Sequence, residues 1–558
     1  MISLALAGLY GRKISRTLQT GLHAFMILSY LLALSGHVGH ITEFLAAFEV
    51  AGALCCIYVA KKKGNPVASL KDPALVIFLF ILIMAFVTCL HMRITNFDDM
   101  HYWAIMPRNM FLINGFPTGN MAGYYYRDYF PVVGIMDFLV LKMAGSYRES
   151  LLFFVIWGLM AAELLPFFSE RGSEGKGIYI CRVFVGIIFP FLISFQFLHC
   201  IGTDIVVTLL FGSTLYALMS PVSSMEAPDH LGIVLSIALL GMMKTTSLIF
   251  AAVCLAVYAV RILDLHNKSS VAWCAAAAAL TGGLWISWKV FCRIKGNTTY
   301  LSDNLNSNLQ GGSFALPPYT GETLRAFLTK LFTYGLNDGK AGLSAFLMLL
   351  LFVAAWVVRF KREGADMRDK SSFVLVVLGL LGYLLVMIYI YLFVFEEWEA
   401  LSLSSYDRYI ATYFGALLYG ALCYLYSGKG IQVRYMALFA AVLLLTVNFP
   451  LVSETLLPGG FMRSRGEIVE KKEAIEAEVL EALGGELPAY GENIVIVDHS
   501  SDQLRAKVII YAAVPGVVKL IQEDEAGNLP SRQELEQTAA DQGASRVIEL
   551  YPRGEDGI

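Results

Sequence analysis

The chain has 558 residues, of which 57% are hydrophobic and only 16% are charged. A soluble globular protein carries about 25% charged residues, so this composition excludes an ordinary soluble enzyme. The net charge of −3 says little about partners, because the polar residues are confined to loops and the C-terminal region. No basic cluster with interleaved aromatic residues suggests a nucleic-acid partner. Apolar runs of about 20 residues recur as far as Pro450, which predicts a multi-pass protein embedded in the lipid bilayer.

Thirteen apolar segments are each predicted to be a membrane helix. They lie near residues 18–36, 41–60, 73–92, 149–168, 178–197, 203–219, 231–244, 246–263, 271–292, 341–358, 373–395, 407–427 and 433–449. The expected fold class is therefore an all-α polytopic membrane protein, with a transmembrane domain over residues 1–450. Arg12, Lys13 and Arg16 precede a full-length apolar segment, which indicates a retained first helix rather than a cleaved signal.

The short connections differ strongly in their content of basic residues. With a cytoplasmic N-terminus, the loops at 61–71 and 359–370 fall inside together with the other strongly basic short loops, as the positive-inside rule requires. The loops at about 93–148 and 293–340 and the hydrophilic region 451–558 then face the extracytoplasmic side. Residues 129–145 are apolar but short, so we expect a helix that lies along the interface or dips into it.

Two adjacent carboxylates, Asp98 and Asp99, follow the third apolar segment, and Tyr102 and Trp103 come soon after. Neighbouring carboxylates repel each other, which favours a task such as holding a proton, a metal ion or a sugar hydroxyl. The alternative is capping of a helix that resumes at Met100, because Asp is a preferred N-cap residue. Asp98 and Asp99 are the candidate catalytic residues, with Tyr102 as a candidate substrate contact.

Further along the same loop, residues 124–131 hold five aromatic side chains around Arg127 and Asp128. Aromatic rings with one ion pair can form a wall that stacks on a sugar and binds an anion. The alternative is an ordinary aromatic belt at the membrane interface. Arg127 and Asp128 are therefore candidate substrate-binding residues.

Three later charged residues fall on the same predicted side of the membrane as Asp98. Asp204 opens a helix, where it is either an N-cap or a site residue. Lys244 interrupts a mostly apolar stretch at a turn; an anion is its natural partner, and snorkelling to the interface is the alternative. Arg408 can fork onto phosphate oxygens, unless it pairs locally with Asp407.

The hydrophilic region 451–558 is expected to form a small extracytoplasmic α/β domain. Helices are predicted over 467–483, 502–513 and 531–542, and strands over 494–497, 517–521 and 547–550. The region contains no glycine-rich phosphate loop and no obvious nucleophile. Scaffolding or acceptor docking is therefore favoured over catalysis.

Taken together, these motifs resemble the GT-C glycosyltransferases, in particular the protein mannosyltransferase and aminoarabinose transferase branch. Phe97-Asp98-Asp99 with Tyr102, followed by Asn114-Gly115-Phe116-Pro117, resembles the first outer loop of that family. Tyr129-Phe130-Pro131, Gly202-Thr203-Asp204 and Gly241-Met242-Met243-Lys244 resemble further elements in the same order. The resemblance covers about residues 73–265. It departs from the family in two extra leading helices, in His101 and in the C-terminal domain.

The resemblance implies transfer of a sugar, with inversion, from a polyprenyl-phosphate carrier to an acceptor on the extracytoplasmic face. A glycan, lipid or protein of the cell envelope would be the acceptor. Asp98 would deprotonate the acceptor hydroxyl, and Asp99 or Asp204 would orient the acceptor or Asp98. Lys244 and Arg408, with Arg127, would hold the lipid phosphate.

Other interpretations stay open. A polysaccharide polymerase or ligase would use a lipid-diphosphate donor, and the second outer loop offers Arg325 and Lys330 for it. A transporter or flippase would show internal repeats and broken helices, and no convincing repeat is evident. A non-catalytic partner would only display the C-terminal domain. No cofactor is required, although a divalent metal at Asp98 and Asp99 is an alternative use of that pair.

Overall fold

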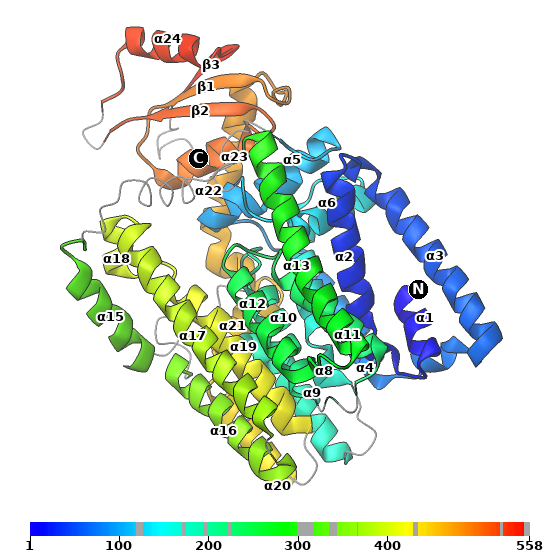
Figure 1. Ribbon diagram of the computed structural model, residues 1–558. Helices are drawn as coiled ribbons and strands as arrows, with labels where there is room; N and C mark the ends of the chain where they lie inside the picture. The colour runs from blue at the N-terminus through cyan, green and yellow to red at the C-terminus, as the bar shows by residue number, and fades with distance from the viewer. Residues whose placement is uncertain are drawn as a thin grey trace.

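The computed structural model describes residues 1–118, 127–169, 175–193, 198–220, 222, 225–297, 316–333, 343–364, 366–427, 433–524 and 528–551. It is a bundle of helices with a small sheet at one end (Figure 1). Tyr124, Tyr125 and Tyr126 of the aromatic stretch lie outside the described residues, as does much of the loop predicted over 293–340.

Each of the thirteen predicted apolar segments forms a helix. They are α2 (Leu18–Leu34), α3 (Ile41–Lys63), α4 (Pro73–Cys89), α7 (Glu149–Glu163) continued by α8 (Leu165–Phe168), α9 (Lys176–Ile193), α10 (Asp204–Met219), α11 (Ala227–Leu240), α12 (Ser247–Ile262), α13 (Lys268–Lys295), α16 (Ala345–Glu363), α17 (Met367–Phe393), α19 (Tyr406–Ser427) and α20 (Val433–Leu445). Their apolar runs carry few helix-breaking residues, and several begin at capping side chains, such as Asp72 at α4 and Ser344 at α16.

The chain is a helical membrane-spanning protein. Within the described residues, 5 helices are long and apolar enough to cross a bilayer, or 6 if the bent pair Arg434–Leu445 and Phe449–Leu456 counts as one span. Several other apolar helices, including α2, α10 and α11, have only 10–17 residues. At about 1.5 Å per residue, 17 residues reach about 26 Å, short of the roughly 30 Å hydrocarbon core. Thirteen crossings and their orientation therefore remain predictions.

The remaining helices are short connections or belong to the C-terminal region. They are α1 (Ile2–Leu9), η1 (Ile14–Arg16), η2 (Val38–His40), η3 (Pro66–Leu70), η4 (Asp99–Trp103), α5 (Ile105–Ile113), α6 (Val132–Ala144), α15 (Thr320–Thr333), α18 (Glu397–Ser402), α21 (Phe449–Leu456), α22 (Gly460–Ala482), α23 (Gln503–Ala512) and α24 (Arg532–Asp541).

Helix α1 has no counterpart among the predicted helices. It packs against α3 at Gly52, where an added Cβ would lie 2.6 Å from the backbone nitrogen of Ile2. An eight-residue apolar stretch is too short to be recognised as a span, and its packing against α3, η3 and α2 stabilises it.

Helix α6 occupies the short apolar stretch predicted over 129–145. Nine of its 13 residues are buried, and it packs against α2, α5 and α7. Protein therefore covers most sides of α6, and the helix lies within the bundle.

Helices α10 and α19 pack most closely of all the membrane helices, and both point their N-terminal ends the same way. A Cβ added to Gly212 would lie 2.7 Å from the Tyr419 ring, and one added to Gly415 would lie 3.0 Å from the Thr208 side chain. Small residues let helices approach this closely in a membrane. The packing brings Asp204, at the start of α10, beside Arg408, in the first turn of α19.

The C-terminal region forms the predicted α/β unit. Strands β1 (Asn493–Asp498), β2 (Val517–Gln522) and β3 (Arg546–Leu550) make a parallel sheet in the order β2-β1-β3. In the register, Asn493 pairs with Val517, and Ile494 pairs with Arg546. Because parallel strands need crossover connections, α23 and α24 follow β1 and β2.

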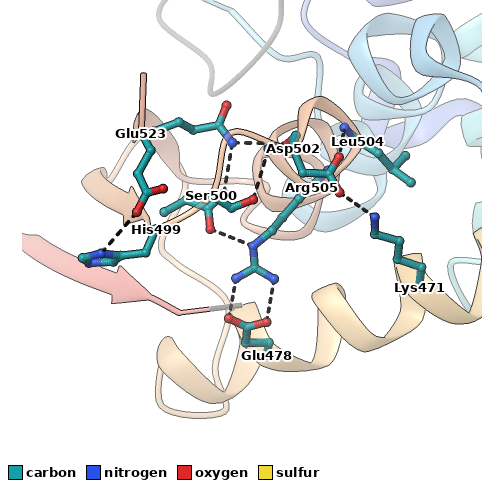
Figure 2. A network of polar contacts seen from close by, with 10 residues as sticks. Lys471, Glu478, His499, Ser500, Asp502, Leu504, Arg505 and Glu523 are labelled. Carbon is teal, nitrogen blue, oxygen red and sulfur yellow. Dashed lines mark hydrogen bonds and ion pairs between the residues drawn. The ribbon is translucent and has the colours of Figure 1, made fainter. Parts of the chain in front are cut away.

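A buried network, here called the tail cluster, joins Glu478, Asp498 and Arg505. Figure 2 shows the pair that Arg505 forms with Glu478. Asp498 is fully buried and accepts from Arg505 Nε at 2.7 Å and from Gln522 at 3.0 Å. The other two guanidinium nitrogens of Arg505 donate to the two oxygens of Glu478. Such a forked pair fixes both groups in orientation, so the cluster ties α22, β1 and α23 together.

Candidate functional site

The segment that carries Asp98 and Asp99 leaves α4 and enters a single π-helical turn, η4. The backbone nitrogen of Asp98 donates to Asn96 Oδ1 at 3.0 Å, which orders the approach to the turn. Asp98 occupies the N-cap position, but its carboxylate makes no capping hydrogen bond. The capping interpretation is therefore wrong for Asp98, whose carboxylate points to another partner.

That partner is Arg408, which lies 310 positions away along the chain and donates to Asp98 Oδ2. Arg408 Nε also lies 3.5 Å from Asp204 Oδ2. Asp204 Oδ1 in turn accepts from Lys244 Nζ at 2.8 Å. The structure thus joins Asp98, Arg408, Asp204 and Lys244 in one alternating chain of charges, which together with Asp99 we call the carboxylate–cation cluster.

The members of this cluster differ in their exposure. Lys244, Asp204 and Arg408 are largely buried, whereas the Asp98 side chain is 39% exposed. The ring of Tyr409 lies 5.2 Å from Lys244 Nζ and 5.4 Å from the Arg408 guanidinium, within the range of cation–π attraction. Asp98 is therefore the member that solvent or a ligand reaches most easily.

Asp99 has a different environment from its neighbour. It is 1% exposed, and its Oδ2 accepts from the backbone nitrogen of Ile201 at 3.1 Å. Its Oδ1 has no hydrogen-bond partner among the described residues. Burial raises the pKa of Asp99 well above its ordinary value, and the charge of Asp98 adds to this effect.

Asp98 shifts in the opposite direction. Burial alone would raise its pKa, but the charge and hydrogen bond of Arg408, with the charge of Lys244, hold the pKa below its ordinary value. Two adjacent carboxyl groups are thus set apart by their surroundings: Asp98 is ionised at neutral pH and Asp99 is favoured as the neutral acid. Such divergence is common where two carboxyl groups have different chemical tasks.

The structural alternatives for the later charged residues are also wrong. Asp204 begins α10 without capping it and pairs with Lys244 instead. Lys244 is 7% exposed, so it does not snorkel outward. Asp407 lies 3.5 Å from Lys330, and Arg408 turns away from it toward Asp98 and Asp204.

The aromatic stretch is only partly joined to the cluster. Tyr102 is 2% exposed, packs edge-to-face on Trp103 and Tyr129, and donates to the carbonyl oxygen of Phe130 at 3.1 Å. Asp128 lies 3.4 Å from Lys289, on α13. Arg127 is half-buried. Substrate contacts by Tyr102, Arg127 and Asp128 stay predictions.

Sequence analysis missed a second set of residues that holds the Asp98 segment in place. Glu149, at the start of α7, accepts from the backbone nitrogen of Ile94 at 2.9 Å and from Tyr511 at 2.9 Å, and pairs with Lys472. The Tyr511 hydroxyl lies 2.6 Å from that of Tyr147. Because Lys472 and Tyr511 belong to the C-terminal region, that region is fastened directly to the loop before Asp98.

The sequence around Glu149 and Tyr511 gave only a weak signal of their contact. Glu149 has the appearance of an ordinary acidic residue in a first helical turn, which the helix dipole favours by itself. Tyr511 lies in a helix of the C-terminal region, where a buried aromatic residue is expected to face its own sheet. Only the folded structure shows that Glu149 and Tyr511 meet beside the loop that precedes Asp98.

The donor set for a metal is limited. Among the described residues, no group of three or more His, Cys, Asp or Glu side chains is arranged to hold a metal ion. At Asp98 the positive charge is supplied by Arg408. The cluster therefore fits an anion held by cations better than a metal ion held by carboxylates.

The chain matches no protein-family model and no curated protein.

Proposed function

We propose that the chain is a membrane glycosyltransferase of the GT-C type, which moves a sugar from a polyprenyl-phosphate carrier to an acceptor hydroxyl on the extracytoplasmic face. The observation that carries this proposal is the meeting of Asp98 with Arg408, Asp204 and Lys244 from four separate parts of the chain. A carboxylate base beside two cations is the minimum set for such a transfer, because a lipid phosphate leaves without being protonated.

In the proposed reaction, Asp98 takes the proton of the acceptor hydroxyl. The acceptor oxygen forms a bond to the anomeric carbon from the face opposite the carrier, and the bond from that carbon to the phosphate oxygen breaks. The electron pair leaves with the lipid phosphate, whose charge Arg408 and Lys244 stabilise. One displacement of this kind inverts the anomeric centre.

The ion pair between Arg408 and Asp98 makes Asp98 a weak base before the donor binds, since its pKa is held low. A donor phosphate would compete for the same guanidinium. Drawing Arg408 toward phosphate would raise the basicity of Asp98 only when a donor is present. In this proposal, Asp204 keeps both cations in position, and neutral Asp99 supports the turn by accepting from Ile201.

The first test separates donor binding from transfer in purified full-length protein. Asp98→Asn should lower transfer from polyprenyl-phosphate hexose or pentose donors by about 10²- to 10⁴-fold, the range for loss of a general base. Binding of polyprenyl monophosphate should persist in this variant and be lost in Arg408→Met.

Glu397→Gln is the matched control, since Glu397 is an exposed carboxylate on α18. It should transfer sugar like the wild type. If Asp98→Asn keeps the wild-type rate while its melting temperature is unchanged, Asp98 is not the base.

A second candidate function uses a lipid-diphosphate donor, as in a polysaccharide polymerase or ligase. The observation in its favour is Lys330, whose Nζ lies 3.5 Å from Asp407, the neighbour of Arg408 in sequence. A third cation beside the residue that precedes Arg408 in sequence offers a partner for a second phosphate. Tighter binding of polyprenyl diphosphate than of monophosphate, with the difference removed by Lys330→Met, would favour this alternative.

A further inference from the structure

A cavity of about 380 Å³ with both polar and apolar walls lies at the other end of α10 from the carboxylate–cation cluster. Its wall includes Ser213, Thr214 and Ala217 of α10, Ser236 of α11 and Gln19 of α2. Asp204 and Ser213 are nine residues apart on one helix, which corresponds to about 14 Å. The cavity is therefore separate from the proposed transfer site.

Beneath the cavity lies a buried pair, His23 and Glu163. His23 Nε2 is 2.7 Å from Glu163 Oε1, and Glu163 Oε2 accepts from Gln19 and Ser213 at 3.0 Å. His23 Nδ1 lies 3.1 Å from Ser236 Oγ, which also donates to the carbonyl oxygen of Gly232. The pair thus links α2, α7 and α11 beneath the cavity.

Three hydroxyl groups of the wall donate to oxygen atoms of the protein itself. Thr214 donates to the carbonyl oxygen of Leu210 at 2.6 Å, Ser236 donates to Gly232 at 2.8 Å, and Ser213 donates to Glu163 or Leu210. Each hydroxyl oxygen keeps a lone pair that can accept a further hydrogen bond. The wall is therefore rich in acceptors and complements a ligand that is rich in donors.

Two kinds of small ligand carry many donors: polyols and ammonium ions. The charged residues at the rim of the cavity discriminate between these two kinds of ligand. Arg12 engages both neighbouring carboxylates, Asp229 and Glu226, and Arg16 adds another positive charge. Because Asp229 already pairs with Arg12, a cationic ligand would have to compete with the arginines for it, whereas a polyol needs no counter-ion.

We infer that this cavity binds a sugar-sized polyol, either free or as the headgroup of a membrane lipid. Ser213, Thr214 and Ser236 accept from its hydroxyl groups, and Ile233 and Met225 supply apolar wall for its C–H faces. The volume lies near the lower end of the roughly 300–1,000 Å³ typical of small-molecule sites, which suits a monosaccharide. The inference is independent of the proposed function.

The test measures the unfolding temperature of the full-length protein in lipid nanodiscs while glucose, mannose or galactose is added. At least one sugar should raise the unfolding temperature with a saturable dependence on concentration. Ala217→Leu, which fills the cavity from its wall, should weaken that sugar's binding at least 10-fold. Thr214→Val, which removes one acceptor at nearly constant volume, should weaken it several-fold. Nanodiscs with a monoglucosyl lipid in place of phosphatidylcholine test the lipid-borne source.

Ala275→Leu makes the same change at an exposed position of α13 and should bind like the wild type. Asp98→Asn should also bind normally, which distinguishes this cavity from the proposed donor site. The inference is overturned if no sugar or glycolipid gives a saturable shift. It is also overturned if Ala217→Leu and Ala275→Leu bind alike, or if inorganic phosphate or choline stabilises the protein while sugars do not.

Discussion

The tail cluster and the carboxylate–cation cluster are both built from buried charges, but they differ in how completely those charges are satisfied. In the tail cluster, Asp498 accepts from Arg505 and Gln522, and the guanidinium of Arg505 is fully engaged with Asp498 and Glu478. In the carboxylate–cation cluster, Asp99 Oδ1 has no partner among the described residues, and Arg408 Nε reaches Asp204 only at 3.5 Å.

This difference separates an architectural network from a candidate site. A satisfied network gains nothing from a ligand and holds its elements in a fixed arrangement. An incompletely satisfied network keeps polar groups that can bind a ligand, and leaving them unsatisfied lowers the stability of the protein. On this comparison, changes in the tail cluster should reduce stability most, and changes in the carboxylate–cation cluster should reduce stability least.

The largest expected effect is that of Arg505→Ala. Removing the guanidinium leaves the carboxylate of Asp498 fully buried without its cation, and breaking a buried pair in this way costs about 3–5 kcal/mol. Hydrogen exchange of the β1 amides in the full-length protein measures the loss.

The matched control is Lys471→Met, which removes a partly exposed partner of Asp502 that Figure 2 shows beside the tail cluster. An exposed pair is worth less than about 1 kcal/mol. Equal losses in Arg505→Ala and Lys471→Met would show that the tail cluster is not architectural.

A smaller effect is expected where the two regions touch. Tyr511→Phe removes the hydroxyl that bonds Glu149 and Tyr147, which leaves buried polar groups short of a partner at about 1–3 kcal/mol. Hydrogen exchange should then quicken in residues 94–104 as well as in α23. Faster exchange in α23 alone would mean that the C-terminal region does not hold the Asp98 segment.

The smallest effect is expected for Asp99→Asn, and it should depend on pH. The folded state raises the pKa of Asp99, so its contribution to stability is fully present below the ordinary Asp pKa of about 4 and is lost as pH rises. Asn has no such titration. The melting temperature of Asp99→Asn relative to the wild type should therefore increase between pH 4 and pH 8. A constant difference would show that Asp99 ionises normally in the folded protein.

Much of the fold was predictable from local patterns. Strands near 494–497, 517–521 and 547–550 and the helices between them are confirmed within a few residues. The apolar segments are likewise helices, because hydrophobic runs and capping residues act over a few neighbouring positions. Helix α1 was not predicted because it is short. Several apolar helices are too short to cross a bilayer alone, so the number of membrane crossings stays a prediction.

The sequence predicted which residues belong to the candidate site, but not how they pair with one another. Asp98, Asp204, Lys244 and Arg408 stood out because charged residues are costly next to apolar helices. No local sequence pattern could show that Arg408 pairs with Asp98 and not with the adjacent Asp407. Nor could it show that, of Asp98 and Asp99, only Asp99 is shielded from solvent. Those outcomes depend on which surfaces meet when helices pack.

The sequence by itself determined the apolar helices, the small α/β unit and the presence of isolated charges at helix ends. The tertiary structure decided how those charges are paired, through the close approach of α10 and α19 at Gly212 and Gly415. It also decided that the C-terminal region is fastened to the Asp98 segment through Glu149. The physical reason is the range of the interactions. Hydrophobic patterns act between residues that are near in sequence, whereas the energy of a charge pair depends on the distance between the two groups in space.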